Sequence, residues 1–167
     1  FPTFAQQYTD ETVENNSLVV ECGDRSRFIS YYDIYLQEAD MYSYTYTTSF
    51  DGEGAITSAI DYVISDELPQ LYCLEGHGER ELPATFADQI EKENIEVQKL
   101  SLLTADEIPV DAAALLIYAP QSDISTEEKD MLAEYASDGG KLMVVAGPVA
   151  DASLDNINDI LADYSIK

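Results

Sequence analysis

The sequence predicts an α/β domain with a mainly parallel sheet, preceded by a β-rich segment. From residue 51 onward, short apolar runs alternate with segments in which apolar residues recur at helical spacing. One run, Ala113–Tyr118, is almost entirely apolar, as a strand buried on both faces should be. Strands that alternate with helices are typical of a parallel sheet covered by helices.

The first 50 residues are expected to form β-structure that is the tail of an upstream region. Ser17–Cys22 and Arg25–Tyr31 are predicted strands, and the glycine turn between them indicates a hairpin. In Tyr31–Phe50, the tyrosines of the Tyr42–Tyr46 strip alternate with serine and threonine, which favours an extended segment with an aromatic face.

Residues 51–167 are expected to form the α/β domain itself, truncated at its C-terminal end. The predicted helices are 55–65, 82–93, 125–137 and 153–163, and the predicted strands are 70–75, 95–100, 113–118 and 141–146. Right-handed crossovers with one reversal give the strand order 2-1-3-4 of a flavodoxin-like three-layer sandwich. Ser125 and Glu128 match a helix capping box.

Two loops are expected at the point where the connections of this sheet reverse direction. Ligands of open α/β sheets bind there, outside the carboxyl ends of the strands. The candidate ligand-binding residues are Gly76, His77, Gly78, Glu79, Pro120, Gln121 and Ser122.

His77 is the only histidine, and its chemistry allows two interpretations. Together with Glu79 it could act as an acid and base or hold a metal ion, which would define a hydrolase or a metal-dependent enzyme. Alternatively, the flanking glycines form a tight turn in which His77 packs or caps the next helix, with Glu79 in the first helical turn. A third possibility is a carbohydrate-binding module that uses the Tyr42–Tyr46 strip.

Other catalytic and metal-binding chemistry is not indicated. Cys22 and Cys73 lack a nearby ligand at metal-binding spacing, so we expect two buried free thiols. If the domain is exported, a disulfide between them is the alternative. Amidotransferase-like folds place a Cys or Ser nucleophile after the third strand, where this chain has Ala119-Pro120. No catalytic residue, cofactor or metal is therefore predicted.

The charge excludes two classes of partner. Eight basic residues against 33 acidic ones give a formal net charge of −25, which repels nucleic acids and anionic membranes. No apolar run approaches the ~20 residues of a membrane span, so this fragment is not expected to insert into a bilayer.

Several stretches, taken together, carry a resemblance to a known family. They are Gly52-Glu53, Ala55–Val63, Leu71–Glu79, Ile108–Ala112, Ala119-Pro120, Ile124–Glu128 and Gly139–Leu142. Over about Ser17 to Pro148 the chain resembles the auxiliary component of gliding-motility-type ABC transporters.

The resemblance implies a non-catalytic auxiliary or interaction domain of an ABC transport system. Such proteins work beside an ABC permease and ATPase, and their large soluble region lies on the extracytoplasmic side of the cell membrane. The anchoring parts of the parent protein would then be absent from this fragment. The resemblance supplies no catalytic residue and no transported substrate.

Overall fold

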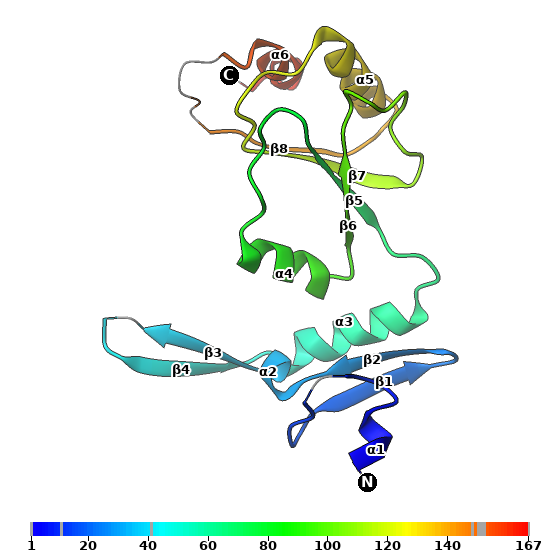
Figure 1. Cartoon of the computed structure of the whole chain (residues 1–167), viewed down its shortest axis with the longest axis vertical. Helices are drawn as coiled ribbons and strands as arrows, with labels where there is room; N and C mark the ends of the chain where they lie inside the picture. The colour runs from blue at the N-terminus through cyan, green and yellow to red at the C-terminus, as the bar shows by residue number, and fades with distance from the viewer. Residues whose placement is uncertain (1, 11, 41, 148, 150–152, 167) are drawn as a thin grey trace. The chain divides into compact units, whose positions relative to one another are not determined.

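A computed structural model shows a mixed α/β protein and describes residues 2–10, 12–40, 42–147, 149 and 153–166 (Figure 1). Pro148, where the family resemblance ends, lies outside the described residues. The chain divides into two compact units, Phe1–Leu68 with Lys92–Asn94, and Pro69–Glu91 with Ile95–Lys167. Each unit is described by itself below.

The first unit contains a β-hairpin covered by one helix. The short helix α1, Pro2–Ala5, comes before the hairpin. Strands β1, Leu18–Cys22, and β2, Arg25–Ile29, pair antiparallel, which confirms the predicted hairpin. Helix α3, Gly52–Ile64, packs against both strands and buries Ala59 and Val63. The compact unit therefore includes α3, whereas the predicted boundary at residue 51 assigns this helix to the α/β domain.

A second hairpin follows β2 in the same unit. Helix α2, Tyr31–Ile34, begins at Ser30, and the Ser30 and Asp33 side chains form a capping box. Strands β3, Tyr35–Asp40, and β4, Thr45–Phe50, then pair antiparallel. The prediction of an extended segment over Tyr31–Phe50 was therefore correct for the two strands. It was wrong for α2, whose capping box overrides the strand pattern, and for Tyr42–Tyr44, which form the turn between the strands.

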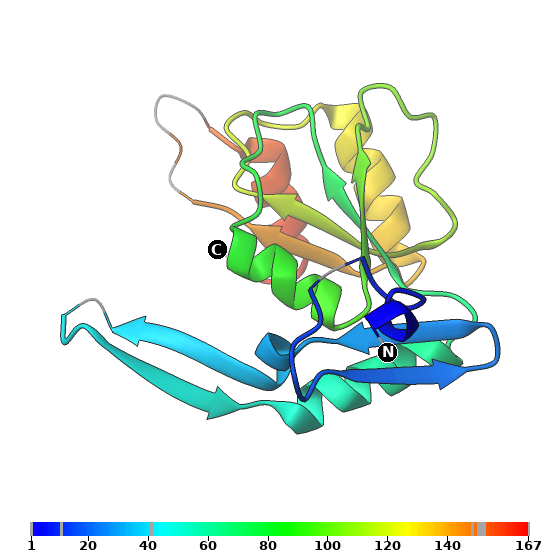
Figure 2. The same cartoon turned by 60° about the horizontal axis from the view of Figure 1, so that its bottom comes forward.

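The second unit is built on a four-stranded parallel sheet (Figure 2). Its strands are β5, Gln70–Leu74, β6, Glu96–Leu100, β7, Ala112–Tyr118, and β8, Leu142–Val145. They lie in the spatial order β6-β5-β7-β8. Their connections depart in opposite directions from the neighbouring strands β5 and β7, so the carboxyl ends of these two strands form the switch point.

Helices α5, Thr126–Ser137, and α6, Asp155–Asp163, pack together on one face of the sheet. The core between them and the sheet contains Leu115, Ile117, Leu132 and Ile157, all almost fully buried. In both views helix α4, Ala84–Lys92, lies on the other side of the sheet from α5 and α6 (Figures 1 and 2).

Helix α4 begins later than the sequence pattern indicated. The N–H groups of Phe86 and Ala87 donate to the carbonyl of Pro83, so the first turn starts there. Leu82 precedes a proline, and this position disfavours helical backbone angles. Consequently Glu79 is not in the first turn of a helix, which corrects that expectation.

The two cysteines are free, and they differ in exposure. Cys73 in β5 is half-buried, as its place in a parallel sheet favours. Cys22 at the end of β1 is exposed, so the expectation that both thiols are buried was wrong for Cys22. The β1–β2 hairpin has only two strands, so β1 has a free edge among the described residues.

Among the described residues, no helix combines the length and the apolar character needed to cross a membrane.

Candidate functional site

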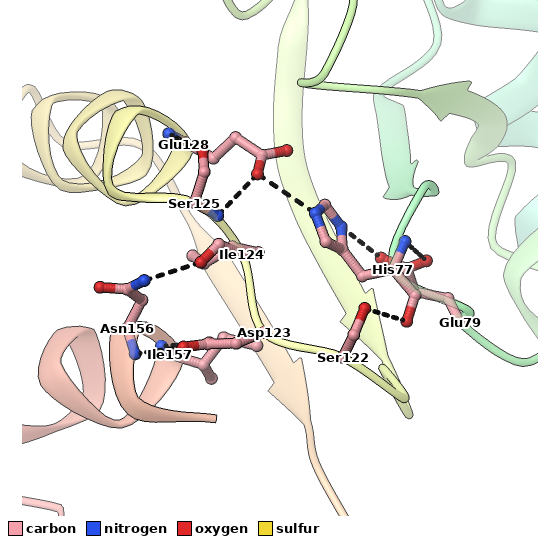
Figure 3. Close-up of polar contacts among 9 residues, drawn as sticks. All are labelled: His77, Glu79, Ser122, Asp123, Ile124, Ser125, Glu128, Asn156 and Ile157. Atoms are coloured by element: carbon pink, nitrogen blue, oxygen red, sulfur yellow. Dashed lines mark hydrogen bonds and ion pairs between the residues drawn. The ribbon is translucent and has the colours of Figure 1, made fainter. Parts of the chain in front are cut away.

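The loops that follow β5 and β7 meet at the carboxyl edge of the sheet (Figure 3). The carbonyl oxygen of His77 accepts hydrogen bonds from the N–H groups of Gln121, at 2.8 Å, and Ser122, at 3.0 Å. The hydroxyl of Ser122 lies 3.3 Å from the same oxygen. The structure therefore brings together the two loops that the sequence placed at the switch point, and it joins them through one carbonyl group.

Both glycines of the first loop adopt backbone angles that other residues avoid. Gly76 has φ of 126° and Gly78 has φ of 73°, both in the region that favours glycine. The space is also limited, because a Cβ on Gly78 would lie 3.1 Å from Cβ of Gln121. Pro120 of the second loop is fully buried. These residues therefore shape the close approach of the two loops.

The imidazole of His77 is buried and lies between two carboxylates. Its Nδ1 is 3.3 Å from Oε1 of Glu79, and its Nε2 is 3.1 Å from Oε2 of Glu128. The side chains are 8%, 7% and 3% exposed for His77, Glu79 and Glu128 respectively. Glu79 also accepts a hydrogen bond from the main-chain N–H of His77, at 2.8 Å, through its other oxygen.

Glu128 is the one member of this cluster that the sequence analysis did not assign to the site. It is the third residue of helix α5 and forms the predicted capping box, accepting from the N–H of Ser125 at 2.8 Å. Its Oε2 thus contacts both Ser125 and His77. The signal was present, because the capping box follows the loop predicted to lie beside His77.

The hydrogen-bond donors and acceptors of His77 and the two glutamates determine how many protons these side chains share. An ionised carboxylate only accepts, whereas a neutral imidazole has one donor and one acceptor nitrogen. Both ring nitrogens of His77 face a carboxylate, so with both glutamates ionised His77 must be the imidazolium. If one glutamate carries the second proton instead, the imidazole is neutral; in both cases two protons are shared among the three buried side chains.

One oxygen of this cluster lacks a partner in the described structure. Oε1 of Glu128 is buried and makes no hydrogen bond, although Oε2 of the same carboxylate has two donors. Burial of an unpaired carboxylate oxygen is costly. Glu128 therefore depends on His77 and on the N–H of Ser125 for its hydrogen bonds.

The loop after β7 also holds helix α6. The two carboxylate oxygens of Asp123 accept from the N–H groups of Asn156, at 2.8 Å, and Ile157, at 3.3 Å. The amide of Asn156 donates in return to the carbonyl of Ile124 at 2.7 Å. Residues 119–125 therefore link β7, α5, α6 and the His77 loop in one hydrogen-bonded network (Figure 3).

This geometry describes a structural cluster more closely than an open reaction centre. Both ring nitrogens of His77 are engaged and the ring is buried, so neither is presented to a substrate. Within the described ranges, no group of three or more His, Cys, Asp or Glu side chains is arranged to hold a metal ion.

The fold and the site define an α/β domain whose switch-point loops are bound to each other around a buried ion-pair cluster. The sequence model of the ABC-transporter auxiliary family, described as an ABC-type uncharacterized transport system, matches residues 63–164. This is more than half of the chain, and the protein belongs to that family. The match covers all four strands of the parallel sheet and the whole His77 cluster. No curated protein and no solved structure matches the chain significantly.

Proposed function

We propose that this chain is a non-catalytic, extracytoplasmic auxiliary domain of an ABC transport system. Membership of the auxiliary family gives the transport role. The arrangement of His77 supports the absence of catalysis, because its imidazole is committed to Glu79 and Glu128 at the place where an α/β enzyme would present a reactive group. This use of the only histidine is the observation that carries the proposal.

The carboxyl edge of the sheet is the proposed contact surface for a ligand or partner. Gly78, Gln121 and Ser122 are exposed on the two loops, while His77 beneath them is buried. The cluster thereby holds together a solvent-facing edge at the switch point. We also infer that α4 and the α5–α6 pair form the outer layers of a three-layer sandwich of the flavodoxin and amidotransferase type.

The proposed partners are the permease and the ATPase of the transporter. The test is to isolate the parent protein, tagged and in mild detergent, from its own cells and to identify what accompanies it. An ABC permease and ATPase in near-stoichiometric amounts support the proposal. Intact parent protein recovered without either of them, under conditions that preserve the permease–ATPase complex, contradicts it.

The sidedness of the domain can be tested with Cys22. This thiol is exposed, so a membrane-impermeant maleimide applied to intact cells should label it if the domain is extracytoplasmic. The parent protein with Cys22→Ser provides the background. Labelling that appears only after the cells are lysed would place the domain on the cytoplasmic side.

The alternative function, an enzyme, can also be tested. A hydrolase or metal-dependent enzyme using His77 and Glu79 requires that Zn²⁺ or Mn²⁺ bind, or that substrate be turned over, in a manner abolished by His77→Gln. Calorimetric titration of both metals into the two proteins checks the metal case. Tight binding to the native chain alone would favour the alternative over the proposal.

A further inference from the structure

The β3–β4 hairpin is a two-stranded sheet with no third strand among the described residues. All of β4 and the last four residues of β3 are exposed. Figure 1 shows the hairpin extending from α2, away from the β1–β2 hairpin of the same unit. An isolated two-stranded hairpin is at best marginally stable in water, so this element is incomplete on its own.

One face of the hairpin carries three aromatic residues, with the polar pair Gln37–Thr48 between them. Residues paired in register share a face, and Tyr35 pairs with Phe50 while Ala39 pairs with Tyr46. Phe50 and Tyr46 are 69% and 74% exposed. The small side chain of Ala39 leaves the flank of the Tyr46 ring open on the β3 side. A large apolar side chain placed beside β3 would fill that space.

The opposite face is polar and acidic. It carries Glu38 and Asp40 on β3, paired with Thr47 and Thr45 on β4. The whole sequence between Arg27 and Arg80 contains no lysine or arginine, so nothing within the hairpin neutralises these carboxylates. Both acidic residues lie on β3, so its free edge attracts cations.

We propose that the free edge of β3 takes up an extended polypeptide segment rich in lysine or arginine as a third strand. The main chain of that segment would satisfy the unpaired N–H and C=O groups of β3. Its alternate side chains would place cations opposite Glu38 and Asp40, and apolar groups over Ala39 beside Tyr46. The inference concerns a surface separate from the His77 loops and does not depend on them.

Charge favours this occupant over a second copy of the chain. A second copy that paired through its own β3 would bring another acidic strand to the same edge, and each chain carries a formal net charge of −25, which opposes association in any register. Like charges directly opposite each other destabilise strand pairing, whereas opposite charges stabilise it. A basic strand is attracted both by the neighbouring carboxylates of β3 and by the net negative charge of the whole chain.

The test uses a fluorescent peptide of alternating lysine and valine and the chain of residues 1–167. Fluorescence anisotropy measures binding, and backbone amide chemical shifts locate it. The hairpin variant combines Glu38→Lys with Asp40→Asn. In the native chain Asp40 accepts hydrogen bonds from the N–H groups of Tyr42 and Ser43, at 2.8 and 3.3 Å. The asparagine keeps a side-chain oxygen that can accept them. The matched control, Glu107→Lys with Asp106→Asn, makes the same charge change in an exposed loop.

We expect the peptide to bind at low salt, with amide shifts concentrated in residues 35–50. The hairpin variant should bind it about tenfold or more weakly, because one of the two favourable cross-strand charge pairs is lost and the other is reversed. The control variant should bind nearly as well as the native chain. A peptide with glutamate in place of lysine should not bind.

Several results would overturn the proposal. They are absence of binding, equal weakening by the control variant, shifts outside the hairpin, or binding of the glutamate peptide. Concentration-dependent dimerisation that protects the β3 amides would show a second copy on this edge instead. Binding of glycans to Tyr42–Tyr46 without binding of the peptide would assign the hairpin to sugars.

Discussion

Replacing His77 by alanine tests whether the buried cluster holds the switch-point loops. The imidazole lies 3.1 Å from Glu128 and 3.3 Å from Glu79. At an effective dielectric constant of about 20, each contact gives about 5 kcal/mol of gross attraction to a charged imidazole. Much of this offsets the cost of withdrawing three charges from water. Alanine removes the attraction and leaves that cost, so the free energy of unfolding should fall by about 3–5 kcal/mol.

The two carboxylates should contribute unequally to this loss. Glu128 is 3% exposed and fixed on the first turn of α5, whereas Glu79 lies on an irregular loop and can turn toward water. Adding Glu128→Gln to His77→Ala should therefore restore more stability than adding Glu79→Gln. A glutamine at 128 can still accept the N–H of Ser125, so the capping box is kept.

Guanidinium denaturation followed by circular dichroism measures these free energies. The midpoint should shift at an unchanged slope. Gln121→Ala is the control, because it changes an exposed side chain of the facing loop and keeps the N–H that binds His77. The reasoning is refuted if His77→Ala costs less than about 0.5 kcal/mol, the range of ordinary surface substitutions. It is also refuted if Glu128→Gln lowers the stability of the His77→Ala variant further.

Three further predictions concern other parts of the chain. Ser125→Ala should cost about 1 kcal/mol of unfolding free energy by removing the cap of α5, in the same denaturation assay. Hydrogen bonds from the Ser43 side chain and from the backbone N–H of Tyr42 hold the pKa of Asp40 below its ordinary value of 3.8. The Asp40 contribution to the hairpin turn should therefore be fully present above pH 3.8 and be lost as the pH falls through the lower folded-state pKa. Backbone amide chemical shifts of the turn, recorded across the acid pH range, measure this loss. Asp40→Asn should abolish the pH dependence. Burial raises the pKa of the Cys73 thiol, so near neutral pH a maleimide should modify exposed Cys22 faster than Cys73, as mass spectrometry of timed samples would show. Equal rates would contradict this assignment.

The sequence predicts best where the structure depends on local signals. The capping box of Ser125 and Glu128, the glycines of the His77 turn and the apolar run of β7 all act over a few residues, and the structure shows each of them. The capping box of Ser30 and Asp33 at α2 is the same kind of local signal, and the prediction of an extended segment over Tyr31–Phe50 does not take it into account.

The contact between His77 and Glu128 shows why the site was only half predicted. The two residues are 51 positions apart, and their meeting depends on the register of β5 with β7 and on the length of two loops. The sequence placed the loops side by side but left open which acidic side chain would reach the histidine. The sequence pairs His77 with Glu79, two positions away, and Glu79 satisfies only one of the two ring nitrogens.

The joining of two loops through the single carbonyl of His77 has a consequence for measurement. The amide protons of Gln121 and Ser122 are sequestered only while the edge between β5 and β7 stays closed. Their exchange with deuterated solvent therefore reports the opening of that edge, residue by residue. A partner that docks onto the closed edge should slow the exchange of both amides, whereas one that separates the loops should accelerate it. The two modes of engagement can thus be distinguished without a structure of the complex.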